Sequence, residues 1–222
     1  MKYYPVYLDI RNRDCLVVGG GQVALRKVEG LLKAGARTTV VSPEFAEGFS
    51  RLTGSAGLEM IMRNYKSADL EGKFLVIGAT DNSKVNRKIS RDAESRNMLC
   101  NIADVPEACN FILPSVVKRG DLMIAISTSG KSPAFARHLR KQLEKQFGEE
   151  YTEFLRLMGA ARKKLLSEKH APEEHKPLFN QLIAENLPSL IREGNTEQAD
   201  RLLQKVLGEG FDYRTLMETA ED

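Results

Sequence analysis

The chain has 222 residues, enough for one large domain or for a domain with a smaller companion. Its apolar fraction of 42% and charged fraction of 28% are ordinary for a globular protein, and a formal net charge of +3 does not favour nucleic-acid binding. The N-terminal residues lack the apolar core of a signal peptide, and no apolar run is long enough to cross a bilayer, so we expect a cytoplasmic protein without membrane contact.

Residues 3–10 alternate in polarity and contain tyrosine and valine, a pattern that predicts a short β-strand. Pro5 has no amide proton to donate to a ladder, which places this strand at the edge of a sheet. The polar residues 11–14 then form the predicted turn into the first central strand.

A strand, a tight turn and a helix are predicted over residues 15–33, CLVVGGGQVALRKVEGLLK. Gly19, Gly21 and Ala24 fit the pattern G-x-G-x-x-G/A of dinucleotide-binding turns. Gly19 permits the turn, Gly21 lets a pyrophosphate approach the backbone, and Ala24 lets the helix pack on the strand. The pyrophosphate would then bind at a helix N-terminus. The alternative is an α/β domain whose glycine turn binds nothing or a different phosphate group.

The first helix is predicted to end at Gly35, and residues 37–42 (RTTVVS) predict a second strand. The spacing from the glycine turn to the end of this strand, about 20 residues, suits a mononucleotide-binding βαβ unit. Ser42, the backbone at Pro43 or the carboxylate of Glu44 can bind ribose hydroxyls there. No arginine or lysine follows the strand closely, which favours NAD over NADP.

Three more strands are predicted at residues 58–62, 74–81 and 99–102, with a helix that begins at Asn82 or Ser83 between the last two. Strands that alternate with helices at this rhythm indicate a parallel sheet covered on both faces. We therefore expect an α/β fold built on a Rossmann-like parallel sheet.

Two aspartates follow strands at the predicted carboxyl edge of the sheet, where open α/β sheets bind ligands. Asp81 ends the strand at residues 74–81, and Asp104 follows the strand at residues 99–102. A carboxylate at this edge can accept a proton if partial desolvation raises its pKa. The alternative is that both aspartates serve only in turns or helix caps.

The pattern changes near Cys109, because residues 111–117 and 122–127 predict two antiparallel strands joined by a short turn. Ser132 and Pro133 predict the start of a helix, and only helical spacing follows. We expect a small all-helical C-terminal domain and three domains in total, over residues 1–110, 111–148 and 149–222.

The loop from Ser127 to Ser132 brings hydroxyl groups and backbone amides together at this helix start, next to Lys131. Such a loop suits a carboxylate or phosphate group. Basic residues outnumber acidic ones between residues 118 and 145, which suits a polyanionic ligand. The alternatives are a helix cap and a solvated basic face.

The cysteine and histidine positions predict no metal site. No C-x-x-C spacing links Cys15, Cys100 and Cys109, and the first two fall in or beside predicted strands as small buried apolar residues. The three histidines lack metal-ligand spacing and are interpreted as surface or interface residues: His138, His170 and His175.

Three segments of this sequence, taken together, resemble the precorrin-2 dehydrogenase family and the N-terminal part of the siroheme synthases. They are VVGGGQVALRKVEGLLKAGARTTVVSPE, IGATDNSKVNRKIS and LCNIADVPEACNFILPSVVKRGDLMIAISTSGKSPAFARHLRKQLE. The resemblance covers residues 4–147 and continues more weakly through the helical remainder. Its segments after residue 98 are much more specific than the glycine turn.

The resemblance implies NAD-dependent oxidation of precorrin-2 to sirohydrochlorin in siroheme synthesis and, in some members, insertion of Fe²⁺ into sirohydrochlorin. It assigns the family's essential aspartate to Asp104. We expect cofactor contacts at Gly19, Gly21, Gln22, Val23, Ser42, Pro43, Glu44 and Thr80. Because precorrin-2 is a polycarboxylate, we expect substrate contacts at Asn101, Ser127, Thr128, Ser129, Gly130, Lys131 and Arg137.

The family's homodimers build their interface from the segment after the Rossmann-like domain, so we expect a homodimer that uses the hairpin and helix over residues 111–148. An alternative function is a non-catalytic NAD-binding redox sensor, which would need neither Asp104 nor a polyanion site. A dehydrogenase for a small substrate usually places a catalytic lysine, tyrosine or histidine near the sheet edge, and the sequence identifies none there.

Overall fold

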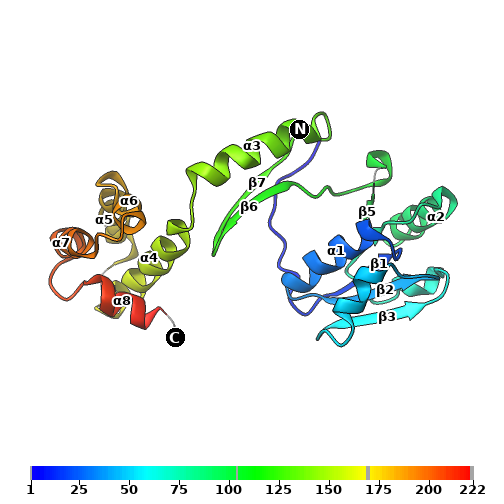
Figure 1. Ribbon diagram of the computed structural model, residues 1–222, viewed down its shortest axis with the longest axis horizontal. Coiled ribbons are helices and arrows are strands. Elements are labelled where there is room, and N and C mark those ends of the chain that lie inside the picture. Colours follow the sequence, from blue (N-terminus) through cyan, green and yellow to red (C-terminus); the bar gives the residue numbers. More distant parts are fainter. Residues whose placement is uncertain (1, 104, 169–170, 221–222) are drawn as a thin grey trace. The chain divides into compact units, whose positions relative to one another are not determined.

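The computed structural model describes residues 2–103, 105–168 and 171–220, and the chain divides into two compact units, Met1–Leu113 and Pro114–Asp222 (Figure 1). The predicted fold class is confirmed, with a parallel sheet, a hairpin and helices in that order along the chain.

The first unit contains five parallel strands in the order β3-β2-β1-β4-β5. They are β1 (Asp14–Val18), β2 (Arg37–Ser42), β3 (Leu58–Met62), β4 (Leu75–Gly78) and β5 (Leu99–Ile102). Because every strand runs in the same direction, the loops that follow all five strands meet at one edge of the sheet.

Helices α1 (Gln22–Lys33) and α2 (Ser83–Glu94) pack against opposite faces of this sheet. The alternation of side chains along β1 explains the division. Cys15 and Val17 belong to the core cluster that contains α1, whereas Leu16 and Val18 belong to the cluster that contains α2. Three short 3-10 helices complete the connections: η1 (Glu47–Leu52), η2 (Ser67–Leu70) and η3 (Pro106–Ala108).

Local signals in the sequence account for both helix boundaries. Gly35 follows the end of α1 with φ of +77°, a conformation in which glycine has no steric penalty. Asn82 caps α2, because its Oδ1 accepts hydrogen bonds from the backbone amides of Lys84 and Val85. Cys15 and Cys100 are buried as expected, and burial raises their pKa values to about 11 and about 12.

The predicted strand over residues 3–10 is wrong. The chain there is extended without strand pairing, and β1 begins only at Asp14. Tyr4 and Val6 are 82% and 60% exposed within this chain, so the alternating pattern does not correspond to a buried face. Ile10, the last residue of the segment, is buried in the core cluster that contains α1.

Residues 109–111, rather than another strand, cover the outer edge of β5. Asn110 Oδ1 accepts a hydrogen bond from the Cys100 amide at 2.8 Å, and its Nδ2 donates to the Met98 carbonyl at 2.8 Å. The Asn110 amide also donates to the Cys100 carbonyl at 3.1 Å. The Cys109 thiol accepts a hydrogen bond from the Ile102 amide at 3.1 Å. The loop between β5 and Asn110 is therefore closed at its base.

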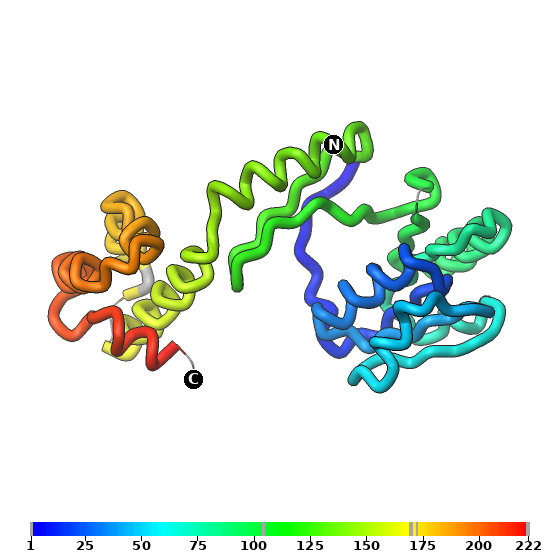
Figure 2. The backbone as a smooth tube through the Cα atoms, viewed as in Figure 1, coloured from blue at the N-terminus to red at the C-terminus, as the bar shows by residue number. Residues whose placement is uncertain are grey.

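The second unit begins with the antiparallel strands β6 (Ser115–Arg119) and β7 (Leu122–Ile126), followed by α3 (Pro133–Gln146). Figure 2 shows the hairpin running along α3, and Val117, Ile126 and Ala136 form their shared core. The first strand starts and ends later than predicted, because Pro114 has no amide proton and Gly120, at φ of +54°, makes the turn.

Five more helices pack around a separate core in the second unit, as expected from the helical spacing. They are α4 (Glu150–Ser167), α5 (Pro172–Ala184), α6 (Leu187–Arg192), α7 (Thr196–Leu207) and α8 (Tyr213–Thr219). Within the described ranges, no helix combines the length and the apolarity that a membrane span requires.

Candidate functional site

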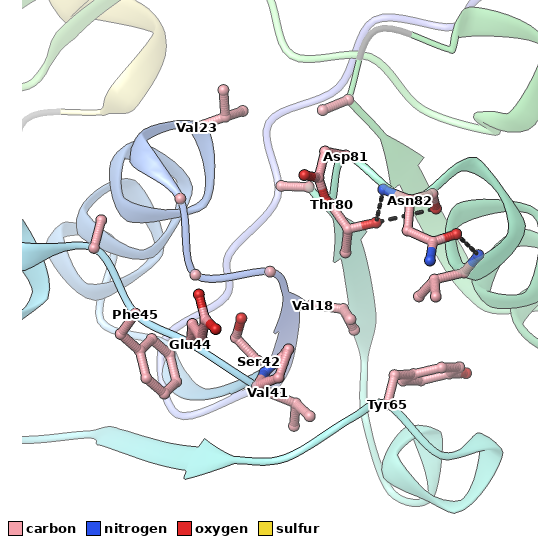
Figure 3. Close-up of a pocket in the computed structure, with 18 of the residues that line it drawn as sticks. Val18, Val23, Val41, Ser42, Glu44, Phe45, Tyr65, Thr80, Asp81 and Asn82 are labelled. Carbon is pink, nitrogen blue, oxygen red and sulfur yellow. Dashed lines mark hydrogen bonds between the residues drawn. The ribbon is translucent and has the colours of Figure 1, made fainter.

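A pocket of about 770 Å³ lies at the carboxyl edge of the sheet in the first unit (Figure 3). It is lined by the glycine turn after β1 and by residues that follow β2, β3, β4 and β5. Its volume is typical of cofactor sites. All of the predicted cofactor residues line it: Gly19, Gly21, Gln22, Val23, Ser42, Pro43, Glu44 and Thr80.

The glycine turn packs closely against the loops that follow β2 and β4. Gly19 has φ of +125°, and a Cβ there would lie 2.2 Å from the carbonyl oxygen of Ala79. A Cβ on Gly20 would lie 1.9 Å from the carbonyl oxygen of Glu44. The Ala46 amide donates a hydrogen bond to the Gly20 carbonyl at 2.8 Å. The turn thus contacts both neighbouring loops backbone to backbone, and any side chain at Gly19 or Gly20 would separate them.

Gly21 differs from the two glycines before it. A Cβ added there would have no described atom within 4 Å, so the space belongs to the pocket. Gly21 is also the N-cap of α1, and no described side chain caps this helix. The amides of the first turn, at Gln22 and Val23, are therefore available to a ligand, and they carry the positive end of the helix dipole. This cradle fits a pyrophosphate group.

The end of β2 supplies two polar groups on one side of the pocket. Ser42 is only 6% exposed, and its hydroxyl forms no hydrogen bond with any described residue. Figure 3 shows this hydroxyl beside the carboxylate of Glu44, which is exposed. Ser42 lines the pocket, so this hydroxyl is open to a hydrogen bond with a bound ribose hydroxyl. The pair therefore fits the ribose position of a dinucleotide.

Thr80 and Asp81 follow β4 on the other side of the glycine turn. The Thr80 hydroxyl lies 2.8 Å from Asn86 Oδ1, and it accepts a hydrogen bond from the Asn82 amide at 3.2 Å. Asn86 Nδ2 donates in return to the Thr80 carbonyl at 2.8 Å. The hydroxyl of Thr80 thus holds the turn into α2, whereas Asp81 is exposed at the pocket.

The candidate base, Asp104, comes two residues after the end of β5 in the sequence. Ala103 lines the pocket, and the next residue, Asp104, lies outside the described residues. Asn101 does not line the pocket. It is 9% exposed, and its Nδ2 donates to the Phe111 carbonyl at 3.0 Å. The structure gives Asn101 a part in holding the chain against β5, and its contact with substrate stays a prediction.

The predicted substrate loop, which includes Gly130, belongs to the second unit and provides most of its own hydrogen-bond partners. The hydroxyl of Ser127 accepts from the Ser129 amide at 3.1 Å, and that of Thr128 accepts from the Ser132 amide at 3.0 Å. The hydroxyl of Ser132 caps α3 at the Phe135 amide. The amides that the sequence offered for an anion are therefore already satisfied at these positions.

Two predicted substrate contacts of this unit are exposed cations. Lys131 and Arg137 form no ion pair with the rest of the described chain. They can bind carboxylates without breaking an existing ion pair, which fits the prediction for a polyanionic ligand.

The described residues contain no group of three or more His, Cys, Asp or Glu side chains that could hold a metal ion. His138 is exposed, as expected. The prediction for His175 is wrong, because it is 3% exposed and packs near Phe179 in α5. His170 lies outside the described residues.

Sequence reasoning missed two contributions to the pocket. Gly20 occupies a position that the glycine pattern leaves open to any residue. The run of three glycines is the signal in the sequence that no side chain fits there. Asn64 and Tyr65 follow β3 and line the pocket. The carboxyl-edge argument applied to Asp81 and Asp104 would have found them, had it been extended to every strand.

Comparison with known proteins gives consistent matches along the chain. Residues 6–115 match a family described as putative NAD(P)-binding, and residues 119–146 match one described as sirohaem biosynthesis protein central. The siroheme synthase of Thioalkalivibrio sulfidiphilus is 36% identical over 214 residues, covering 96% of this chain and 44% of the relative. The siroheme synthase of Methylobacillus flagellatus is 35% identical over 207 residues, covering 93% and 44%.

A solved structure of SirC, a precorrin-2 dehydrogenase, matches with a TM-score of 0.73 and 25% sequence identity over 99% of both chains. The chain spans less than half the length of the siroheme synthases that it matches, but nearly the whole length of this dehydrogenase.

Alanine substitutions at Gly21 and Gly19 separate binding from folding. Gly21→Ala places a methyl group in open pocket space, so we expect normal thermal unfolding and at least tenfold weaker NADH binding by fluorescence titration. Gly19→Ala forces the methyl group into the Ala79 carbonyl, and we expect a loss of about 1–3 kcal/mol or more in the free energy of unfolding. An unchanged NADH affinity in the Gly21 variant would contradict the assignment of this space to the pyrophosphate.

Proposed function

We propose that this chain, which matches siroheme synthases over 93–96% of its length and a precorrin-2 dehydrogenase over 99% of both chains, catalyses the NAD-dependent oxidation of precorrin-2 to sirohydrochlorin in siroheme synthesis. The observation that carries this proposal is one cavity lined by the N-terminus of α1, which no described side chain caps, by the Ser42 hydroxyl and by Ala103, the residue before Asp104. A dinucleotide and a proton acceptor are the two things that this oxidation requires.

Bound NAD⁺ supplies the nicotinamide ring that accepts a hydride. The amides of the first turn of α1 bind the pyrophosphate, and Ser42 and Glu44 bind the hydroxyls of the adenosine ribose. Because β2 and β4 lie on opposite sides of β1, the loops after β4 and β5 would hold the nicotinamide end. Those loops contain Asp81 and Asp104.

The oxidation removes one hydride and one proton from the macrocycle. We assign the proton to the Asp104 carboxylate, which follows the pocket residue Ala103 directly in the chain. Lys131 and Arg137, exposed and without ion pairs among the described residues, are the cations proposed to pair with the carboxylates of the substrate. An NAD-binding redox sensor is the competing function, and it would require neither the base nor these cations.

Insertion of Fe²⁺ is the second activity in this proposal, with the ion as a substrate. The support is the name of the relatives: siroheme synthases are named for an iron-containing product. The chain's part in this step would be to accept the pyrrole protons that Fe²⁺ replaces, and Asp104 is the group proposed for that role.

We also propose that the protein acts as a homodimer through the hairpin and α3. The face of the hairpin opposite α3 exposes Val116 and Met123, which are 37% and 43% exposed. α3 covers one face of the hairpin and leaves these two side chains on the other face open to solvent within this chain. A second copy of the hairpin would cover these side chains.

Asp104→Ala tests the chemical step. We expect NADH affinity to be unchanged and the rate of NADH formation from precorrin-2, followed anaerobically by absorbance, to fall roughly 10²–10⁴-fold. Asp81→Ala, which removes the other carboxylate at this edge, is the matched control and retains most of the activity. Parallel reactions with Fe²⁺ measure metal insertion into sirohydrochlorin. Wild-type protein that binds NADH but leaves precorrin-2 unoxidised would support the redox sensor instead.

The double substitution Val116→Lys and Met123→Lys tests the dimer. We expect a dimer for the wild-type protein and a monomer for the variant by light scattering, because four lysines would meet across the interface. The side chains on the α3 side of the hairpin are untouched, so circular dichroism should stay unchanged. A wild-type monomer at micromolar concentration would refute the proposed interface.

A further inference from the structure

The loop after β3 supplies Asn64 and Tyr65 to the pocket, and the proposed function has not yet used them. An ion pair and several hydrogen bonds hold this loop. Both its backbone and the Tyr65 side chain are held in place, by different partners.

The backbone is held by Arg63 and Asp69. The guanidinium of Arg63 donates two hydrogen bonds to the Asp69 carboxylate, at 2.8 and 2.7 Å, and a third to the Asn64 carbonyl at 3.0 Å. The Lys66 amide donates to the same carboxylate at 2.8 Å. Burial opposes ionisation of Asp69, yet these donors keep its pKa below the usual value. Residues 63–69 therefore form a closed turn.

The side chain of Tyr65 is held from α2. Its hydroxyl donates to Asp92 Oδ2 at 3.0 Å. Lys88 Nζ lies 4.9 Å from the centre of the ring and 3.2 Å from the same carboxylate oxygen. Burial and the Asp92 hydrogen bond raise the pKa of Tyr65 above its usual value, so the phenol stays neutral. These contacts fix the ring in one orientation.

Figure 3 shows the Tyr65 hydroxyl on the far side of the ring from Ser42 and Glu44. The hydroxyl is engaged by Asp92, so the ring itself is what Tyr65 offers to the pocket. Val18, Val41 and Val85 line the pocket as well, which makes this part of it apolar. A flat base with apolar faces fits such a surface better than a phosphate or a ribose does.

The strand order shows which part of a dinucleotide reaches Tyr65. The amides proposed to bind the pyrophosphate follow β1. Ser42 and Glu44, which are proposed to bind the ribose, lie at and after the end of β2. β3 is the next strand outward, so a ligand that runs from β1 past β2 ends at the loop after β3. The nicotinamide end extends in the opposite direction, toward β4.

We propose that Tyr65 is the residue against which the adenine base packs. The closed turn at residues 63–69 holds Tyr65 in place and so contributes to the affinity for the adenosine half of the cofactor. The inference rests on the proposed function only for the binding of a dinucleotide in this cavity. It makes no use of precorrin-2 or of Asp104.

Three variants of Tyr65 test this inference by direct NADH titration. Tyr65→Phe and Tyr65→Leu both lose the hydrogen bond to Asp92, but only the phenylalanine keeps the ring. We expect Tyr65→Phe to bind within about threefold of the wild type. Tyr65→Leu and Tyr65→Ala should bind roughly 5–100-fold more weakly, the usual effect of removing one base–aromatic stack. ADP-ribose keeps the adenosine half of the cofactor. The affinity of the leucine and alanine variants for ADP-ribose, measured by calorimetry, should therefore fall by the same factor.

Each outcome separates this inference from the proposed function. Equal weakening in the phenylalanine and leucine variants would show that Asp92 matters and the ring does not, and would overturn the role of Tyr65. Unchanged NADH affinity in Tyr65→Ala, or weaker NADH binding with unchanged ADP-ribose binding, would also overturn it. A wild-type protein that binds neither NADH nor ADP-ribose would overturn the proposed function as well. Thermal unfolding of all three variants verifies that the fold is retained.

Discussion

The arrangement of the first unit depends on close contact between three pieces of backbone. The glycine turn lies against the Ala79 carbonyl on one side and the Glu44 carbonyl on the other, with no side chain between them. This contact sets the distance between the loops after β2 and β4, and hence the width of the cavity. Gly21, the one glycine of the three that meets nothing, is the one that faces the space for a ligand. The two glycines required by close contact thus stand next to the one proposed to face the ligand, in the same turn.

The pocket has two ends of different character. The end toward β3 is apolar and rigid, because two sets of ion pairs hold the turn at residues 63–69 and the ring of Tyr65. The end toward β4 and β5 is polar, with Asp81 exposed there. A rigid apolar end suits the part of a cofactor that only binds, and a polar end suits the part that reacts. The proposed direction of the dinucleotide follows from this difference as well as from the strand order.

The sequence predicted the elements whose signals are local. Strands 58–62 and 99–102 were predicted at their observed residues, because short apolar runs between polar turns leave little choice of bounds. The strand predicted at residues 3–10 failed because pairing needs a partner that alternation cannot reveal. The composition of the loop at Ser127 suggested an anion site, but only the structure shows that its hydroxyls accept hydrogen bonds from its own amides. The place of Tyr65 after β3 could be read from the sequence, but the contacts that fix its ring come from Asp92 and Lys88, far along the chain, and only the structure shows them.

The side chain of Asn110 has a consequence for the behaviour of the protein at high concentration. A β-strand at the border of a sheet exposes unpaired amides and carbonyls that another molecule can join, which is a common route to aggregation. Asn110 satisfies backbone groups of Cys100 on β5 and of Met98 just before it with the two ends of one carboxamide and its own amide. A sixth strand therefore finds those positions already taken. The same residue that closes the loop after β5 therefore also protects this edge of the sheet from pairing with another molecule.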